Sequence, residues 1–282
     1  DVRVIKAHWG EPLDPDQFKK LLEEDIHKKI KAVILTHSET STGVINDLKT
    51  INNEVKSNSK AITIADCVTS LGASNIPMDE WGIDVIASGS QKGYMIPPGL
   101  SFVAMSKRAW EANDQSNLPK FYLDLKQYLK SANINSNPFT PAINLYFALE
   151  ASLTMMQKEG LNNIFQRHTR HQKATQEGVK AMGLNLFTKE GFGSPAITAV
   201  EPKDIDAEII RKAMKNDFDI LLAGGQDHLK GKIFRIGHLG FVNNRDIISV
   251  ISALESTLNK MGKLDVPIGR GIAKTIAVLN NE

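Results

Sequence analysis

The sequence predicts an α/β fold with a mostly parallel sheet, followed by a smaller α+β domain. Four short apolar runs, typical of buried strands, occupy residues 32–35, 61–65, 83–87 and 102–105. Helical segments alternate with them, and successive strand ends lie about 20 to 30 residues apart, which is typical of crossover units in parallel sheets. After Gly183 the pattern changes to shorter elements, and 282 residues are enough for two domains.

The first predicted helix starts at Asp14 and Pro15. The Asp14 carboxylate suits the N-cap, and Pro15 suits the first helical position. Ahead of this helix, residues 2–5 alternate like a strand inside a fold, and the chain does not begin with Met. We therefore expect further residues upstream. Within the helix, apolar side chains follow at helical spacing, at Phe18, Leu21, Leu22 and Ile26.

Further helices are predicted in the middle of the chain. One covers about 46–57, and a long one follows the prolines of residues 137–141. Residues 119–136 are polar, which predicts irregular structure. A helix at about 160–182 carries a basic run, which predicts a solvated helix face. The residues of this run are Arg167, Arg170, His171 and Lys173.

Short elements follow in the second half. Strands are predicted at 195–200, 218–222 and 233–236, and helices at 204–215 and 244–261. We divide the chain into a large domain, a small C-terminal domain and a tail without an assigned role, at residues 1–155, 156–262 and 263–282.

The composition is ordinary for a globular protein, with 41% hydrophobic and 23% charged residues. A formal net charge of +2 gives no reason to expect nucleic acid or an anionic membrane as a partner. No run approaches the roughly 18 apolar residues of a membrane-spanning helix. The single cysteine, Cys67, excludes an intramolecular disulfide and fits a reducing compartment, so we expect a cytoplasmic protein.

Three polar side chains follow the ends of predicted strands: Thr40, Asp66 and Lys92. Ligands of parallel α/β sheets bind beyond the carboxyl ends of the strands, so we expect a site there. Each residue also has an ordinary alternative. Lys92 could be a surface lysine in a Gly/Pro-rich turn, Asp66 could cap the segment after it, and the loop at Thr40 could be a simple turn.

Arg235 lies in an otherwise apolar strand, where its guanidinium needs a carboxylate, either a structural one or that of a substrate. We expect no metal site, because His37 and His238 lack the spacing and the carboxylates of a ligand set. The segment 224–232 resembles a phosphate-binding loop, but it fails on spacing, lacks a following Ser or Thr, and precedes a strand. We reject it as a nucleotide site.

Five motifs in order, THSETSTG, ADCVTSLGA, SGSQKGYMIPPG, NPFTP and FRIGHLG, resemble those of the class V aminotransferases. The similarity is strongest to the alanine–glyoxylate and serine–glyoxylate aminotransferase group, which includes sequences labelled as a soluble hydrogenase small subunit. The resemblance runs from about residue 3 to 261. It implies a fold-type I pyridoxal phosphate enzyme that moves an amino group between a small amino acid (serine, alanine or glycine) and glyoxylate or pyruvate.

The resemblance also implies the roles of individual residues in catalysis. Lys92 forms the Schiff base with the cofactor aldehyde and, once displaced, moves the proton at the substrate α-carbon. Asp66 keeps the pyridine nitrogen protonated. Arg235 clamps the substrate carboxylate.

Four further residues are implied in cofactor binding. Val68 packs on one face of the ring, Thr40 hydrogen-bonds the cofactor, and Gln91 contacts its phosphate. Thr140 reaches the phosphate of the neighbouring subunit's cofactor, which implies a homodimer. Some relatives have Tyr where this chain has Asn137, three residues before that threonine.

Family members carry a further segment upstream, with a Gly-containing phosphate loop and an aromatic residue stacked on the ring. We therefore expect residues 1–282 alone to bind cofactor weakly or not at all. Two alternatives stay open. One is a cysteine desulfurase-like enzyme, in which Cys67 would have to be the nucleophile although buried cysteines are usually inert. The other is a non-catalytic subunit that binds a hydrogenase partner.

Overall fold

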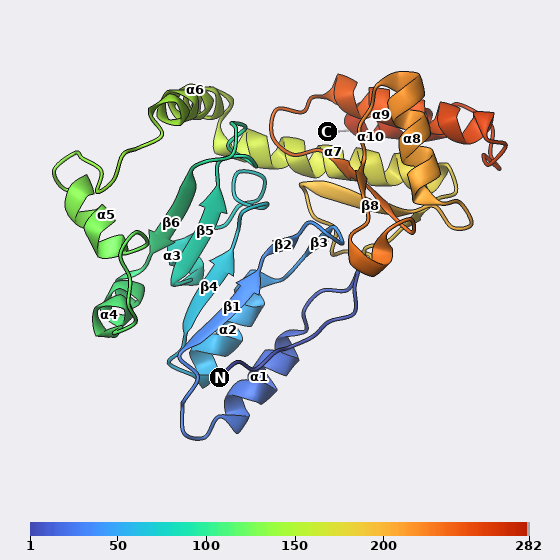
Figure 1. Ribbon diagram of the computed structural model, residues 1–282. Helices are drawn as coiled ribbons and strands as arrows, with labels where there is room; N and C mark the ends of the chain where they lie inside the picture. Colours follow the sequence, from blue (N-terminus) through green and yellow to red (C-terminus); the bar gives the residue numbers. More distant parts are fainter. Residues whose placement is uncertain (281–282) are drawn as a thin grey trace.

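The computed structural model describes residues 1–280 and contains two four-stranded sheets (Figure 1). The first has the order β1 (Ala32–Thr36), β4 (Ile62–Asp66), β5 (Val85–Gly89) and β6 (Ser101–Met105). β1, β4 and β5 run parallel, whereas β6 pairs antiparallel with β5. The mostly parallel sheet predicted from the apolar runs is confirmed.

Two helices, α1 (Pro15–Glu24) and α2 (Leu48–Asn58), pack on each other and cover one face of this sheet. The predicted N-cap of α1 is confirmed, because the Asp14 side chain accepts a hydrogen bond from the Asp16 N–H. On the other face, Ile34 is 73% exposed. The core between helices and strands includes Phe18, Leu35, Leu48, Ile51, Ala65 and Ile86.

The beginning of the chain differs from the prediction at two places. Helix α1 ends at Glu24, so Ile26 lies outside it and is 80% exposed. The reason is Asp25, whose carboxylate accepts the N–H of Ile30 and holds the chain in a turn. Residues 2–5 form no strand.

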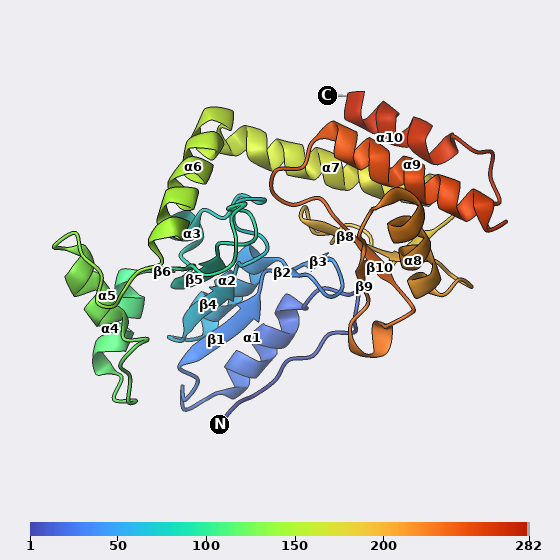
Figure 2. The ribbon, with the colours of Figure 1, turned by 45° about the horizontal axis from the view of Figure 1, so that its top comes forward.

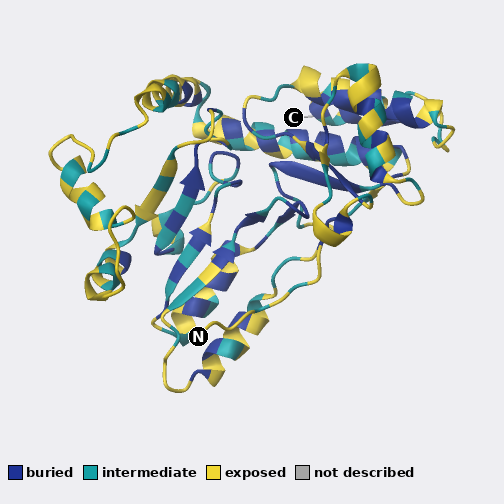
Figure 3. Ribbon diagram, viewed as in Figure 1, coloured by how far each residue is buried: buried dark blue, intermediate teal, exposed yellow. Residues whose placement is uncertain are grey.

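Three short helices flank the first sheet: α3 (Met78–Trp81), α4 (Lys107–Gln115) and α5 (Leu125–Ala132). The expectation of irregular structure at 119–136 is therefore wrong in part, since the Asp124 side chain caps α5. Residues around α5 are exposed or half-buried (Figure 3).

Two long helices, α6 (Ile143–Glu159) and α7 (Leu161–Ala181), lead to the second sheet (Figure 2). They meet at Gly160, whose φ of +86° is left-handed and suits glycine. The second sheet is antiparallel and consists, in order, of β7 (Asn185–Leu186), β8 (Ile197–Glu201), β10 (Phe234–Gly237) and β9 (Ala223–Gly224).

Helices lie on one side of the second sheet and close its core (Figure 2). They are α7, α8 (Ala207–Phe218), α9 (Asn244–Lys260) and α10 (Arg270–Asn280). The strand predicted at 218–222 is wrong, because α8 continues to Phe218 and Asp219 ends it in the left-handed conformation at φ +55°.

The tail after residue 262, which had no assigned role, forms α10. This helix packs against α7 and α9 and buries Thr275 and Leu279. Within residues 1–280, no helix has the length and apolar character needed to cross a membrane.

A small hairpin, β2 (Ser38–Glu39) and β3 (Val44–Ile45), joins the two parts of the chain. The hydroxyls of Ser38 and Ser194 lie 2.7 Å apart, and the Thr188 hydroxyl donates to the Thr42 carbonyl at 2.7 Å. The two sheets have separate hydrophobic clusters. The division of the chain at residue 155 stays a prediction.

Candidate active site

The carboxyl ends of the parallel strands meet at one edge of the first sheet. In the register of β1, β4 and β5, Thr36, Asp66 and Ala87 lie side by side. Asp66 is the last residue of β4, and Lys92 follows the end of β5 by three residues. Both therefore emerge at the edge where parallel sheets bind ligands.

The Asp66 carboxylate is exposed and only partly engaged. Its Oδ1 accepts the N–H of Val68 at 2.9 Å, so it does cap the following turn. Its Oδ2 accepts no hydrogen bond from the described residues. Asp66 also lines an open cavity of about 500 Å³, together with Trp9, Glu39 and Ser41. One carboxylate oxygen is thus left for a ligand.

The backbone around Lys92 is held from several directions. A Cβ on Gly93 would lie 2.2 Å from the Leu71 carbonyl oxygen, so two backbone segments touch there. The hydroxyl of the fully buried Ser90 donates to the Pro97 carbonyl at 2.8 Å. The half-buried Lys92 side chain itself has no hydrogen bond or ion pair within residues 1–280. A fixed backbone therefore presents a lysine whose amine is not engaged.

Arg235 in β10 links the second sheet to this edge. It is 8% exposed, and its Nη1 donates to the Thr40 carbonyl at 2.7 Å while its Nε donates to the Gly224 carbonyl at 3.0 Å. Its Nη2 makes no hydrogen bond to the described part of the chain. Burial lowers the pKa of the Arg235 guanidinium, and the nearby Glu39 carboxylate opposes this effect. The structure thus brings Arg235 and Thr40 together and leaves a donor of the guanidinium available.

The remaining predicted site residues, Val68, Gln91 and Thr140, make no side-chain hydrogen bonds to the residues described above. Val68 is half-buried directly after Asp66, whereas Gln91 is exposed beside Lys92. Thr140 is exposed on the segment between α5 and α6 and makes no hydrogen bond within residues 1–280. Its predicted role concerns a neighbouring subunit and stays a prediction.

Buried histidines near the site are engaged by the protein itself. His37 Nδ1 lies 2.9 Å from the Ser70 hydroxyl, and burial lowers its pKa to about 4. His238 lies between the Pro195 carbonyl at 2.7 Å and the Thr198 hydroxyl at 2.9 Å, and burial lowers its pKa to about 3. No cluster of His, Cys, Asp or Glu suited to a metal ion occurs among residues 1–280.

Cys67 lies between Asp66 and Val68 and is fully buried. Burial raises the pKa of its thiol to about 12. Because the thiolate is the nucleophilic form, this cysteine is poorly suited to attack a substrate.

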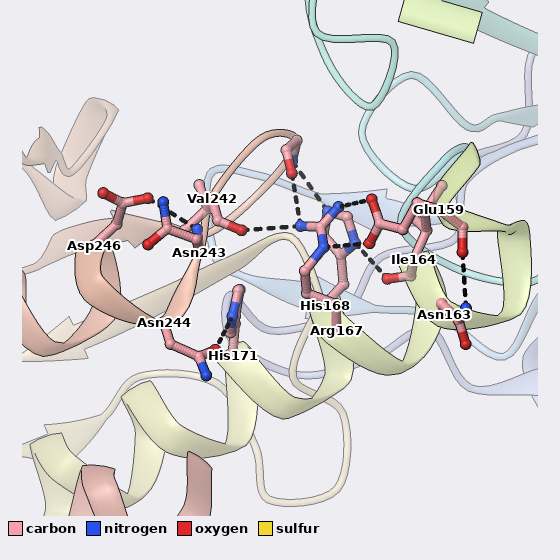
Figure 4. Close-up of polar contacts among 11 residues, drawn as sticks. Glu159, Asn163, Ile164, Arg167, His168, His171, Val242, Asn243, Asn244 and Asp246 are labelled. Atoms are coloured by element: carbon pink, nitrogen blue, oxygen red, sulfur yellow. Dashed lines mark hydrogen bonds and ion pairs between the residues drawn. The ribbon is translucent and has the colours of Figure 1, made fainter. Parts of the chain in front are cut away.

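The solvated helix face predicted from the basic run of α7 is wrong in part. His168 and His171 are buried, Arg167 is half-buried, and Lys173 is exposed. Arg167 donates to the carbonyls of Gly240 and Val242, in the segment after β10 (Figure 4). The spacing of Ile164, His168 and His171 fits one buried helix face, which is the signal that could have indicated this.

Comparisons with known proteins give a consistent result. The family model described as aminotransferase class-V matches residues 1–238. The chain is 58% identical over 276 residues to a protein of a Synechococcus species named soluble hydrogenase, small subunit, with 98% of this chain and 72% of that protein covered. It is 37% identical over 286 residues to the serine–glyoxylate aminotransferase of Arabidopsis thaliana, with 100% and 71% covered.

Among solved structures, the ureidoglycine–glyoxylate aminotransferase of Bacillus subtilis superimposes with a TM-score of 0.90 at 31% identity. The match covers 100% of this chain and 73% of that one.

Proposed function

The chain belongs to the class V aminotransferase family, and from this premise we propose that it moves an amino group between a small amino acid (serine, alanine or glycine) and glyoxylate or pyruvate. Its fold is that of the fold-type I aminotransferases. One observation carries the proposal. Arg235 crosses from the second sheet to the Thr40 carbonyl, at the edge where Asp66 ends β4.

The residues at this edge fit pyridoxal phosphate by the chemistry of their donor set. Asp66 offers a carboxylate oxygen for the pyridine nitrogen, and Lys92 offers an amine for the aldehyde. Thr40 and Gln91 offer polar groups for the remaining oxygens, and Val68 offers an apolar surface for the ring. When bound, the cofactor supplies an electron sink for the electrons released at the substrate α-carbon.

Residues of the chain would bind the substrate and transfer the proton. Arg235 binds the substrate carboxylate through Nη2, and its two bonds to backbone carbonyls fix the plane of the guanidinium. Lys92 Nζ would accept the proton of the substrate α-carbon and pass it on to the bound cofactor, and would carry the proton in the opposite direction when the acceptor receives its amino group. The close backbone contact between Gly93 and Leu71 would help to keep that amine in place.

The names of two relatives favour glyoxylate as the acceptor. The serine–glyoxylate and the ureidoglycine–glyoxylate aminotransferases differ in the donor and share glyoxylate. The proposal extends to a cytoplasmic homodimer in which Thr140 contacts the cofactor phosphate of the partner subunit.

The test uses the complete gene product with pyridoxal phosphate, glyoxylate and either serine or alanine. We expect glycine to form with the wild-type protein and with Lys173→Ala, whose lysine is exposed on α7. We expect Lys92→Ala to form none. Equal glycine formation by Lys92→Ala would contradict the assignment of this lysine.

A partner-binding role is the second candidate, favoured by the hydrogenase name of the 58% identical relative. Size-exclusion chromatography of the complete gene product with a hydrogenase partner separates the two candidates. Co-elution without any transamination favours the subunit, whereas transamination by the protein alone favours the enzyme. The burial of Cys67 argues against a cysteine desulfurase.

A further inference from the structure

The segment after β10 is fixed at Gly240 on three sides. Its N–H donates to His168 Nε2 at 3.0 Å, and its carbonyl accepts from Arg167 Nη1 at 2.8 Å (Figure 4). On the third side, a Cβ would lie 3.1 Å from Met95 Cγ and 3.8 Å from the Lys92 carbonyl oxygen. Gly240 has a left-handed φ of +84°. This glycine therefore touches the turn that carries Lys92.

Arg167 is the centre of these contacts. Its Nη1 also donates to the Val242 carbonyl at 3.0 Å. Its Nε and Nη2 donate to the two oxygens of Glu159 at 2.6 and 3.1 Å, a bidentate pair across the junction of α6 and α7 at Gly160 (Figure 4). The side chains are 16% and 33% exposed, so water screens this pair less than a surface pair. Glu159 thus holds the guanidinium plane in the orientation that reaches both carbonyls.

Helix α6 also contacts the turn that carries Lys92. The hydroxyl of the buried Ser152 donates to the Tyr94 carbonyl, and the Met95 N–H donates to the Lys92 carbonyl at 3.0 Å. The turn that carries Lys92 is therefore attached to the middle of α6. The segment that follows Arg235 is attached, through Arg167 and Glu159, to the C-terminal end of the same helix.

We propose that Arg167, oriented by Glu159, is a positioning residue that sets the distance between Arg235 and Lys92. It touches no reacting atom and acts through Gly240. The inference rests on the proposed function, because it assigns Arg235 to the substrate carboxylate and Lys92 to the proton. Without Arg167, two carbonyls and a carboxylate lose their donor, and Gly240 keeps only the hydrogen bond to His168 to hold it beside Met95.

A change in the distance between Arg235 and Lys92 should affect catalysis, because reaction rates depend strongly on the relative position of the reacting groups. A displacement of about 1 Å can lower a rate roughly a hundredfold. For Arg167→Ala we expect the KM for the amino donor to rise about tenfold or more, with cofactor attachment at Lys92 retained. Arg167→Lys keeps the charge but not the planar fork, so an intermediate effect is expected. Glu159→Gln should resemble Arg167→Lys.

Arg108→Ala is the matched control. Arg108 Nη2 also donates to two carbonyls, of Lys60 and Ala61, and its Nη1 lies 3.6 Å from the Asp84 carboxylate. Lys60 and Ala61 lie directly before β4 and Asp84 directly before β5, so these contacts are at the opposite ends of the strands from Asp66 and Lys92. Its loss should lower the melting temperature without raising the KM.

The experiment compares the variants in the complete gene product by steady-state kinetics and by hydrogen–deuterium exchange. We expect Arg167→Ala to speed exchange in both peptides, 238–243 and 90–96, and Arg108→Ala to speed neither. Unchanged exchange at 90–96 in Arg167→Ala, or a KM equal to that of Arg108→Ala, overturns the inference. If Arg167→Ala does not fold, Arg167→Lys decides by the same two measurements. If the wild type does not transaminate, the proposed function fails, and exchange alone still decides whether Arg167 holds the Lys92 turn.

Discussion

Replacement of Gly93 by alanine tests whether the Lys92 turn is as tightly packed as the structure indicates. The new Cβ would lie 2.2 Å from the Leu71 carbonyl oxygen and 3.0 Å from the Gly72 Cα. Carbon atoms in contact normally lie about 3.5 to 4.0 Å apart. Both obstacles are backbone atoms, so no side-chain rotation can relieve the clash. The two segments must separate by about 1 Å, and Lys92 must move with them.

The expected cost follows from overpacking in rigid surroundings. Insertion of a methyl group into well-packed structure destabilises by about 1 to 3 kcal/mol. In a chain of this size each kcal/mol lowers the melting temperature by about 2 to 4 °C. The displacement of Lys92 should also lower the fraction of protein with cofactor on this lysine.

Gly237→Ala is the control for this substitution. No atom lies within 4 Å of a Cβ at Gly237, and its φ is not left-handed, so the change should stay within about 0.5 kcal/mol. Thermal unfolding followed by circular dichroism, and urea unfolding, measure both variants. A Gly93→Ala protein as stable as Gly237→Ala would refute the close packing around Lys92.

Three further substitutions probe other parts of the site. Arg235→Ala removes a charged hydrogen-bond donor, and a hydrogen bond to a charged group contributes about 1.5 to 3 kcal/mol. The KM for the amino donor should therefore rise roughly 10- to 150-fold, while cofactor attachment is retained. An unchanged KM in steady-state kinetics argues against binding of the substrate carboxylate by Arg235. Burial lowers the pKa of His37 and His168 to about 4, so between pH of about 6.5 and 4 these imidazoles are protonated in the unfolded chain but not in the folded one. Their contribution to the free energy of unfolding is therefore complete above pH of about 6.5 and is lost as the pH falls toward 4, by up to about 1.4 kcal/mol per pH unit for each histidine. Urea unfolding at pH 7 and pH 5 checks this: His37→Gln should show a shallower loss of stability than the wild type, and an equal loss would speak against it. Because burial raises the pKa of the Cys67 thiol to about 12, iodoacetamide should modify this thiol far more slowly in the native protein than in urea. Cys67→Ala should still transaminate. Fast alkylation of the native protein, or loss of activity in Cys67→Ala, would support the cysteine desulfurase hypothesis.

Local sequence patterns predicted the part of the fold that depends on neighbouring residues. The apolar runs predicted the strands of the first sheet, and for the parallel strands β1, β4 and β5 the reason is that such strands consist largely of apolar residues. The cap of α1 was predictable because Asp14 acts only two residues along the chain. The same logic placed Asp66 and Lys92 at strand ends.

Long-range contacts explain what the sequence did not predict. The basic run of α7 has the composition of a solvated face, yet Arg167 meets carbonyls 73 and 75 residues away. Arg235 was expected to pair with a structural or a substrate carboxylate, and its donation to the Thr40 carbonyl, 195 residues away, was not predicted. Asp84 stands at the start of a predicted strand, and it is buried because it accepts from the N–H of Thr63 and the hydroxyl of Ser106.

The second sheet was harder to predict because its strands are short. β9 has only two residues. Before it, Ile220 and Leu222 pack against the helices without pairing as a strand, whereas Leu221 is 76% exposed. A short apolar run of this kind fits a strand or a buried connection equally well. The hydrophobic pattern therefore indicated apolar side chains that enter the core, but it did not indicate whether their backbone pairs in a sheet.

The most direct test of the account is the identity of the lysine that carries the cofactor. The complete gene product is incubated with pyridoxal phosphate, reduced with borohydride, digested and mapped by peptide mass spectrometry. We expect the added cofactor mass on Lys92, and we expect no added mass there when serine is added before the reduction. Label on another lysine, or no label on Lys92 in a folded protein, would contradict it.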